Sequence, residues 1–374
     1  MDPLLSLLAD LVRIPSMNPM GRARTGEAYT EEAVAEYVAA YTRKAGMDVE
    51  VYPVAPHRPN VIARVDTGAE RTLMLEAHLD TVHTDTMTIP PFDPVVHDGR
   101  LYGRGACDTK GSLAVFLFAV ASLLARGTKL RYNIILAAVA DEEYQFTGAR
   151  AAVANGLRAD FGIAGEPTGL HIIRAHKGVT RWRLHTRGTA AHSAYPERGE
   201  NAIYRMGEVL VRLDAYASGL QHTTPHPVLG PPTLSVGVIE GGQAVNIVPD
   251  LCTIEIDRRT LPGETREDVL APVEKLLNGI RGWSMDEPHL SVEGMDVAGD
   301  SEIVRLLVEG IAAEQIQPVV EGAQYATDAG TYNEAGIPTV VFGPGDISRA
   351  HTAEEYIEID QLHAAVRIIQ RMLT

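Results

Sequence analysis

The feature that most constrains the fold of this chain is a set of short apolar runs separated by helical patterns. The runs are rich in Ile, Val, Leu and Ala, and they occupy residues 73–75, 134–139, 163–164 and 339–342. Apolar residues with helical spacing are found at residues 31–44, 112–126 and 360–373. Strands that are apolar on both faces and alternate with helices are typical of a parallel sheet covered on both sides. We therefore expect an α/β fold built on a mainly parallel sheet with flanking helices.

The pattern changes in the middle of the chain. Alternating polar and apolar residues predict half-exposed strands at 180–186 and 251–257, and helical spacing is found at 201–213 and 266–280. The α/β pattern then resumes at residues 301–314. A chain of 374 residues is also long for a single hydrophobic core. We expect a catalytic, metal-binding domain of residues 1–177 and 289–374, interrupted by a smaller ferredoxin-like α+β domain at 178–288.

Charge and cysteine content exclude several classes of partner. The 33 Lys and Arg residues are outnumbered by 49 Asp and Glu, which gives a net charge of −16 that repels nucleic acid and anionic membranes. The apolar stretch at residues 113–125 is shorter than the roughly 20 residues that cross a bilayer, so it is predicted to be a buried helix. Cys107 and Cys252 are too few for a disulfide framework, which favours a reducing cytoplasm.

Potential metal ligands follow the predicted strands. His78 and Asp80 come directly after the first apolar run, where the Asp80 carboxylate could hold the imidazole nitrogen that does not face a metal. Further acidic residues follow other runs or open a helix, and they are Asp108, Asp141, Glu142, Glu143 and Glu166. Any one of these groups could be a helix cap or part of a solvated loop. Because open α/β sheets bind ligands at the carboxyl ends of their strands, all of them together predict a metal site there, with His351 as a further ligand.

The charges of this set suit two divalent ions. Two ions carry four positive charges, and one aspartate with two glutamates would neutralise three, which leaves positive charge to activate water. Imidazoles and carboxylates without thiolates suit zinc, and manganese or cobalt could substitute for it. Of the adjacent Glu142 and Glu143, one is needed as a ligand and the other could accept the proton of the attacking water. The residues alone leave open which glutamate has which role.

These motifs resemble those of the M20 metallopeptidase family over the whole chain. The matching segments are His78-Leu-Asp80-Thr-Val, Gly103-Arg-Gly-Ala-Cys-Asp108-Thr-Lys-Gly, Asp141-Glu-Glu143, Glu166-Pro-Thr and Ala350-His351-Thr, in the family's order. The resemblance implies that Asp108 bridges two metal ions, that His78 and Glu166 complete one site, and that Glu143 and His351 complete the other. It also implies that Glu142 is the general base, that Asp80 supports the site, and that the peptide bond from Asp108 to Thr109 is cis.

The same resemblance assigns roles within residues 178–288. His192 lies in a segment that looks like the family's lid, where it would stabilise the oxyanion, and Asn246 and Arg259 would contact the substrate. Because side chains alternate along a strand, only one of Arg258 and Arg259 should face the substrate. The family pattern further predicts a homodimer joined through residues 178–288, with His192 reaching the active site of the opposite subunit.

The predicted activity is hydrolysis of the amide bond of an N-acyl amino acid. Segments such as Tyr325-Ala-Thr-Asp328 and Asp257-Arg-Arg-Thr look most like those of acetylornithine deacetylases. A succinyl-diaminopimelate desuccinylase, a broad aminoacylase and a dipeptidase or carboxypeptidase are the alternatives within the family, since one fold serves many substrates. A binding protein that retains the fold without catalysis is the alternative outside the enzymes.

Overall fold

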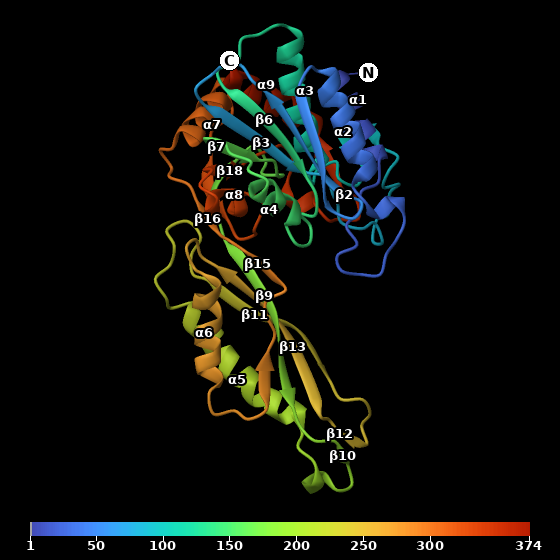
Figure 1. The fold of residues 1–374 in the computed structure, drawn as a ribbon, viewed down its shortest axis with the longest axis vertical. Coiled ribbons are helices and arrows are strands. Elements are labelled where there is room, and N and C mark those ends of the chain that lie inside the picture. The colour runs from blue at the N-terminus through green and yellow to red at the C-terminus, as the bar shows by residue number, and fades with distance from the viewer. Residues whose placement is uncertain (1) are drawn as a thin grey trace. The chain divides into compact units, whose positions relative to one another are not determined.

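The computed structural model describes residues 2–374, which form two compact units (Figure 1). The first unit contains the residues up to Arg174 together with Val297–Glu321 and Thr327–Thr374. The second contains Ala175–Asp296 and Gly322–Ala326. The second unit therefore includes residues on both sides of the stretch 178–288 as well as a short later segment.

Four parallel strands form the centre of the sheet in the first unit (Figure 1). In spatial order they are β6 (Asn133–Val139), β3 (Thr72–His78), β7 (Phe161–Ala164) and β18 (Thr339–Val341). Antiparallel strands extend the sheet at both sides, and they are β2 (Arg58–Val65) and β1 (Asp48–Ala55) beside β6, and β8 (Ile172–His176) and β16 (Met295–Asp296) beyond β18. Strand β17 (Val320–Ala323) also pairs with β8. The predicted α/β class with a mainly parallel sheet is confirmed.

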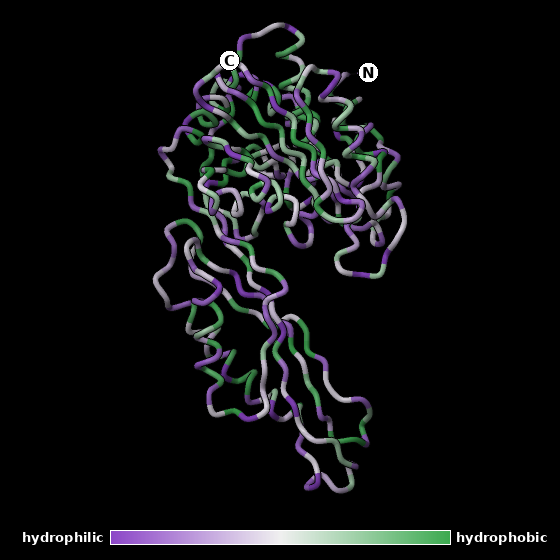
Figure 2. The backbone as a smooth tube through the Cα atoms, viewed as in Figure 1, coloured by the Kyte–Doolittle hydropathy of each residue, from purple (hydrophilic) through white to green (hydrophobic). Residues whose placement is uncertain are grey.

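Helices cover both faces of this sheet. On one face lie α2 (Glu32–Lys44) and α3 (Lys110–Ala125), with α1 (Pro3–Arg13) and α9 (Ile359–Leu373) packed on α3, and α7 (Glu302–Ala313) packed on α9. On the other face lie α4 (Thr147–Ala154) and α8 (Ala329–Glu334), which pack against Ile62, Met74 and Ile135. The α3 helix is buried along most of its length, as its apolar sequence predicts, and in Figure 2 the hydrophobic colour follows the central strands.

A small sheet joins two distant segments of the first unit. It consists of β4 (Val95–His97), β5 (Arg100–Tyr102) and β19 (Tyr356–Glu358), in the order β19-β5-β4. The pairing of β19 with β5 connects the segment after His351 to the segment before Asp108. Two short 3₁₀ helices of this unit lie at Glu27–Tyr29 and Ile347–Arg349.

The second unit is an antiparallel sheet with helices on one face. Its strands run in the order β11-β13-β9-β14, with β15 also paired to β9, and their bounds are β9 Gly178–Arg187, β11 Thr233–Gly241, β13 Leu251–Thr260, β14 Trp283–Met285 and β15 Leu290–Val292. The helices α5 (Ala202–Leu220) and α6 (Arg266–Leu277) enclose a core around Trp182. A two-stranded ladder of β10 (Ala191–His192) and β12 (Ile247–Val248) pairs His192 with Ile247, and a 3₁₀ helix at Pro196–Arg198 follows β10.

Within the described part of the chain, no helix combines the length and the apolar character that crossing a membrane would require.

Candidate metal centre

Neighbouring parallel strands bring the predicted ligands to one edge of the sheet. His78 is the last residue of β3 and lies opposite Val139 at the end of β6, which leads directly into Asp141-Glu142-Glu143. Strand β7 ends two residues before Glu166. Two groups of three side chains at this edge could each hold a metal ion, because within each group the ligand atoms all lie within 4.8 Å of one another. One group is His78, Glu142 and Glu166, and the other is His78, Asp108 and Glu143.

The Asp108 carboxylate lies between two imidazoles. Its Oδ1 atom is 3.1 Å from Nε2 of His78, and its Oδ2 atom is 3.2 Å from Nε2 of His351. Glu166 approaches the same His78 nitrogen to 3.8 Å, and Glu143 approaches the His351 nitrogen to 3.1 Å. The structure thus brings all five predicted ligands together around one aspartate.

His78 is held by the residue that follows it by two positions. Its Nδ1 atom lies 2.9 Å from the backbone carbonyl oxygen of Asp80 and 3.5 Å from the nearer carboxylate oxygen. The carbonyl is therefore the closer partner, and it fixes the ring so that Nε2 faces Asp108. The Asp80 carboxylate instead accepts hydrogen bonds from the backbone N–H groups of Glu142 and Glu143, both at 3.1 Å.

The site carries more negative charge than its histidines can neutralise. Burial raises the pKa of the Glu166 carboxyl well above its usual value, and the charge of Asp108 raises it further. Burial likewise raises the pKa of Glu142, and Glu166 adds to the effect. For Asp108 burial opposes ionisation, but hydrogen bonds from His351 and His78 outweigh it and lower the pKa. Divalent cations would relieve this repulsion, so the residues fit a metal site.

The types of donor also fit the proposed metals. The ligand atoms are imidazole nitrogens and carboxylate oxygens, which suit zinc, manganese or cobalt. The neighbouring Cys107 is buried, and its thiol donates to the backbone carbonyl of Asp346 at 3.4 Å. The peptide bond between Asp108 and Thr109 is cis, as predicted.

Comparison with known proteins identifies the family. Residues 74–374 match the model of peptidase family M20/M25/M40. The chain belongs to the M20 family. Among curated M20 relatives, the acetylornithine deacetylase of Myxococcus xanthus is 35% identical over 356 residues, which cover 90% of each chain. The acetylornithine deacetylase of Yersinia pseudotuberculosis is 33% identical over 389 residues, covering 100% of this chain and 97% of the relative.

Solved M20 structures share the fold. A metallo-carboxypeptidase from Sulfolobus solfataricus superposes with a TM-score of 0.82 at 21% identity, covering 100% of this chain and 98% of the other. A tripeptidase from Staphylococcus aureus gives a TM-score of 0.80 at 21% identity, covering 99% and 96%. A Bacillus subtilis M20 protein described as a dinuclear metal-binding peptidase gives a TM-score of 0.70 at 19% identity, covering 99% of this chain and 96% of the other. Membership of the M20 family makes the protein a metal-dependent amidohydrolase or peptidase with a dinuclear metal site.

The remaining predicted site residues lie in the second unit. His192 is exposed on β10, where its Nδ1 atom accepts a hydrogen bond from the Ala194 backbone at 3.0 Å. Asn246 precedes β12, and its backbone carbonyl oxygen accepts a hydrogen bond from the backbone N–H of Ser193 at 3.1 Å. The structure therefore brings Asn246 close to the His192 segment, and the roles of both residues stay predictions.

The two arginines of β13 point to opposite faces of their sheet, as strand alternation predicts. Arg258 is buried on the helix-covered face, and its guanidinium donates to Glu264 at 2.8 Å. Arg259 lies on the polar face with Asp257, which accepts hydrogen bonds from Arg259 Nε at 2.8 Å and from Arg181 Nε at 2.7 Å. Of the two, Arg259 is the one available to a ligand.

Several residues that support the site were not predicted from the sequence. Glu355 accepts hydrogen bonds from the backbone N–H groups of Cys107 and Asp108, and it forms a buried ion pair with Arg104 at 2.6 Å. Asn18 bonds both Asp80 and Asp141. The position of Glu355, four residues after His351, could have identified it as part of the site. Nothing in the sequence around Asn18 indicates that it supports the site.

Proposed function

We propose that this protein hydrolyses the amide bond of N-acyl amino acids and that N-acetylornithine is its preferred substrate. The observation that carries the proposal is the 33–35% identity to acetylornithine deacetylases along 90–100% of the chain. The complete ligand set around Asp108 supports a catalytic protein over a binding protein that only retains the fold. A location in the cytoplasm remains a prediction.

In this proposal His78 and Glu166 would hold one divalent ion, Glu143 and His351 would hold another, and Asp108 would be a ligand to both. Zinc is the expected metal, with manganese or cobalt as substitutes. When bound, divalent cations would supply Lewis acidity toward the amide carbonyl and toward water. Glu142 accepts the proton of the attacking water and delivers it to the leaving amine. The proximity of Glu142 to His78 and Glu166 supports this role.

Residues of the second unit are proposed to recognise the substrate. Arg259 binds the α-carboxylate through a bidentate pair, and its place on the polar face of the sheet, oriented by Asp257, supports this assignment. His192 donates to the oxyanion that develops on the attacked carbonyl, where such donors have their largest effect. Asn246 assists in substrate contact, supported by its hydrogen bond to the segment that carries His192.

The second unit is also the proposed dimer interface. Strand β11 is at the edge of its sheet and exposes Val238 and Ile239, and an exposed apolar edge strand favours pairing with another strand. On α5, Tyr204 and Val211 are 77% and 72% exposed. We propose that a second copy of the chain covers β11 and α5.

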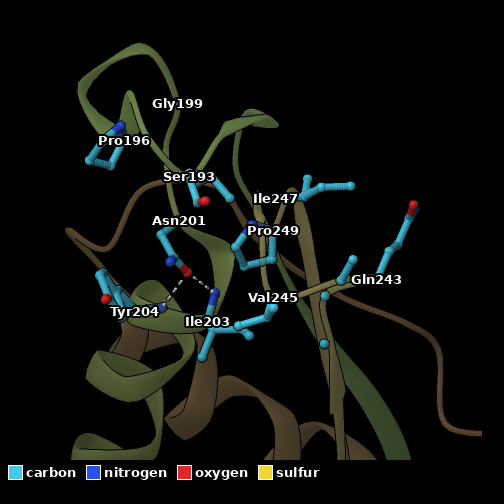
Figure 3. Close-up of a pocket in the computed structure, with 14 residues that line it drawn as sticks. Ser193, Pro196, Gly199, Asn201, Ile203, Tyr204, Gln243, Val245, Ile247 and Pro249 are labelled. Carbon is cyan, nitrogen blue, oxygen red and sulfur yellow. Dashed lines mark hydrogen bonds between the residues drawn. The ribbon is translucent and has the colours of Figure 1, made fainter.

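A hollow of about 850 Å³ adjoins this surface (Figure 3). Its lining residues come from residues 193–201, from the start of α5 and from residues 241–249. Figure 3 shows Asn201 capping α5 by accepting hydrogen bonds from the backbone of Ile203 and Tyr204. Val245 on its wall is fully exposed. Burial of such a side chain against a second copy would stabilise the dimer.

The proposed activity is tested by metal analysis and a substrate panel. The purified protein is assayed for release of free amine from N-acetylornithine, other N-acetyl amino acids, N-succinyl-diaminopimelate and dipeptides, before and after treatment with a chelator. We expect about two bound metal ions per chain, chelator-sensitive activity and the highest kcat/KM for N-acetylornithine. Preference for the succinyl compound or for dipeptides would replace the proposed substrate. The absence of both metal and turnover would favour a binding protein.

A further inference from the structure

A single buried amide connects two aspartates behind the metal centre. The Asn18 Nδ2 group donates to Oδ2 of Asp80 and to Oδ1 of Asp141, both at 2.8 Å. Asn18 is itself fixed, because its backbone N–H donates to the carbonyl of Thr81 at 2.7 Å and its side-chain oxygen accepts from Met20 N–H at 2.8 Å. Only 1% of Asn18 is exposed. All the observed hydrogen bonds of this side chain are therefore made inside the protein.

Asp80 and Asp141 both shape the turn that carries the two catalytic-site glutamates. Asp80 accepts the backbone N–H groups of Glu142 and Glu143 at 3.1 Å each. Asp141 has a φ of 66°, a left-handed conformation that glycine adopts freely and that aspartate adopts when local hydrogen bonds support it. Its side chain also accepts a hydrogen bond from Thr147 at 2.7 Å. The conformation of this turn thus depends on contacts that hold both aspartates in place.

Charge explains why an amide is needed at this position. Asp80, Asp141 and Glu31 are buried carboxylates. Arg58 forms ion pairs with two of them, at 2.6 Å from Glu31 and 3.3 Å from Asp141. Asn18 supplies two N–H donors between Asp80 and Asp141 without adding charge. A carboxylate there would repel both neighbours, and an apolar side chain would remove one hydrogen-bond donor from each aspartate.

We propose that Asn18 is a positioning residue for the metal centre. By holding Asp80 and Asp141 with one amide group, it fixes the turn so that Glu142 and Glu143 point toward the ligand set of His78. Asn18 acts through the two aspartates, and its contribution is to geometry and metal affinity. This inference rests on the proposed metal-dependent function, but Asn18 itself has no part in the proposed mechanism.

The test measures zinc affinity and kinetics for Asn18→Ala and Asn18→Asp. We expect each to weaken zinc binding, measured by competition with a chelating dye, or to lower kcat by about 10- to 100-fold, as for other residues that support metal ligands. KM should change little. The matched control is Asn155→Asp, which makes the same chemical change at an exposed position of the same unit and should resemble the parent.

Two further measurements distinguish positioning from simple loss of stability. In an Asp80→Ala background, Asn18→Ala should have a smaller effect than in the parent, because residues that act in one network are not additive. All titrations are made where circular dichroism shows the variant folded, and Asn18→Ser replaces Asn18→Ala if the latter does not fold. Parent-like zinc affinity and kcat in folded Asn18 variants, or full additivity with Asp80→Ala, would overturn the proposal. Because zinc affinity needs no substrate, a protein that cleaves nothing in the panel can still support it.

Discussion

The Oε1 atom of Glu355 lies 3.0 Å from the backbone nitrogen of Asp108 and accepts its hydrogen bond. The same oxygen accepts from Cys107, and the second oxygen of Glu355 pairs with buried Arg104. The segment after His351 therefore fixes the backbone of the aspartate at the centre of the ligand set. Glu355 and Asp108 are 247 positions apart in the chain.

Removal of Glu355 should destabilise the first unit. Glu355→Ala leaves the Arg104 guanidinium buried without its ion-pair partner, and breaking such a pair typically costs about 3 to 5 kcal/mol. The free energy of unfolding, measured by urea denaturation followed by circular dichroism, should fall by that order. Glu354→Ala, at the exposed neighbouring position, should change it by less than about 0.5 kcal/mol. Equal effects of the two variants would show that the buried pair contributes little.

Substitution of Glu142 should remove activity, whereas substitution of Glu143 should remove bound metal. Glu142→Gln should abolish turnover and retain both metal ions, because a general base acts on water without holding the ions. Glu143→Gln should lose metal, because Glu143 lies beside His351 and Asp108. Metal content is measured by mass spectrometry after dialysis. Glu142 also lies close to His78 and Glu166, so loss of an ion from Glu142→Gln would reverse the two assignments.

Arg259→Ala should raise KM by about 10- to 100-fold with a smaller change in kcat, since a charge-assisted hydrogen bond contributes about 1.5 to 3 kcal/mol. Arg183→Ala, a change on the neighbouring strand β9, is the control and should leave KM near the parent value. Steady-state kinetics on an N-acyl amino acid and on its carboxamide completes the experiment. Equal processing of the carboxamide by the parent enzyme would remove the α-carboxylate from the proposal.

His192 should act across the proposed dimer. A heterodimer of a His192→Ala subunit and a Glu142→Ala subunit contains one site with both residues intact if His192 acts in trans, so activity should return to about half the parent level per dimer. If His192 acts within its own chain, each site keeps one defect. The heterodimer is isolated with two affinity tags. A verified heterodimer without activity, or a fully active monomer, would contradict the trans arrangement.

His176 should make the second unit less stable in acid. It is fully buried, its Nδ1 atom lies 2.9 Å from the Lys177 carbonyl, and burial lowers its pKa from 6.5 to about 4. Between these values the unfolded chain binds a proton that the folded chain does not, so stability is complete above pH 6.5 and falls as the pH approaches 4.

His176→Gln should reduce the slope of the unfolding free energy against pH, by an amount equivalent to at most about one proton bound on unfolding. Urea unfolding at pH 5, 6 and 7 can be followed by tryptophan fluorescence, because Trp182 and Trp283 both lie in the unit that contains His176. His222→Gln, at an exposed position of that unit, should keep the parent slope. The same slope in His176→Gln and the parent would assign the acid sensitivity to other groups.

The sequence predicted best those helices and strands whose own pattern of apolar residues determines their structure. The apolar runs became β3, β6, β7 and β18, and the continuous apolar stretch became the buried α3. The second unit's helix at 201–213 was predicted too short, because α5 continues to Leu220. Tyr216 and Leu220 extend the spacing of its buried face, and Gly219 does not end the helix.

The ligands were predictable and their supports were not, for a physical reason. His78, Asp108 and Glu166 stand at the ends of predicted elements, so a rule about strand ends identifies them. Asn18 and Glu355 act through hydrogen bonds to residues 62 to 248 positions away, and no local periodicity records such a contact. The separate faces of Arg258 and Arg259 followed from alternation alone, whereas the choice between them required the ion pair with Glu264.

The division of the first unit into separate stretches of the chain also affects how the protein is made. Synthesis proceeds from the amino terminus, so Ala175–Asp296 leaves the ribosome before β18, His351 and α9. The sheet and helices of the second unit can form while the first unit still lacks a central strand and one of its ligands. The metal centre is therefore completed late in biosynthesis, and a nascent chain that has not yet reached His351 holds a carboxylate-rich edge without its second imidazole.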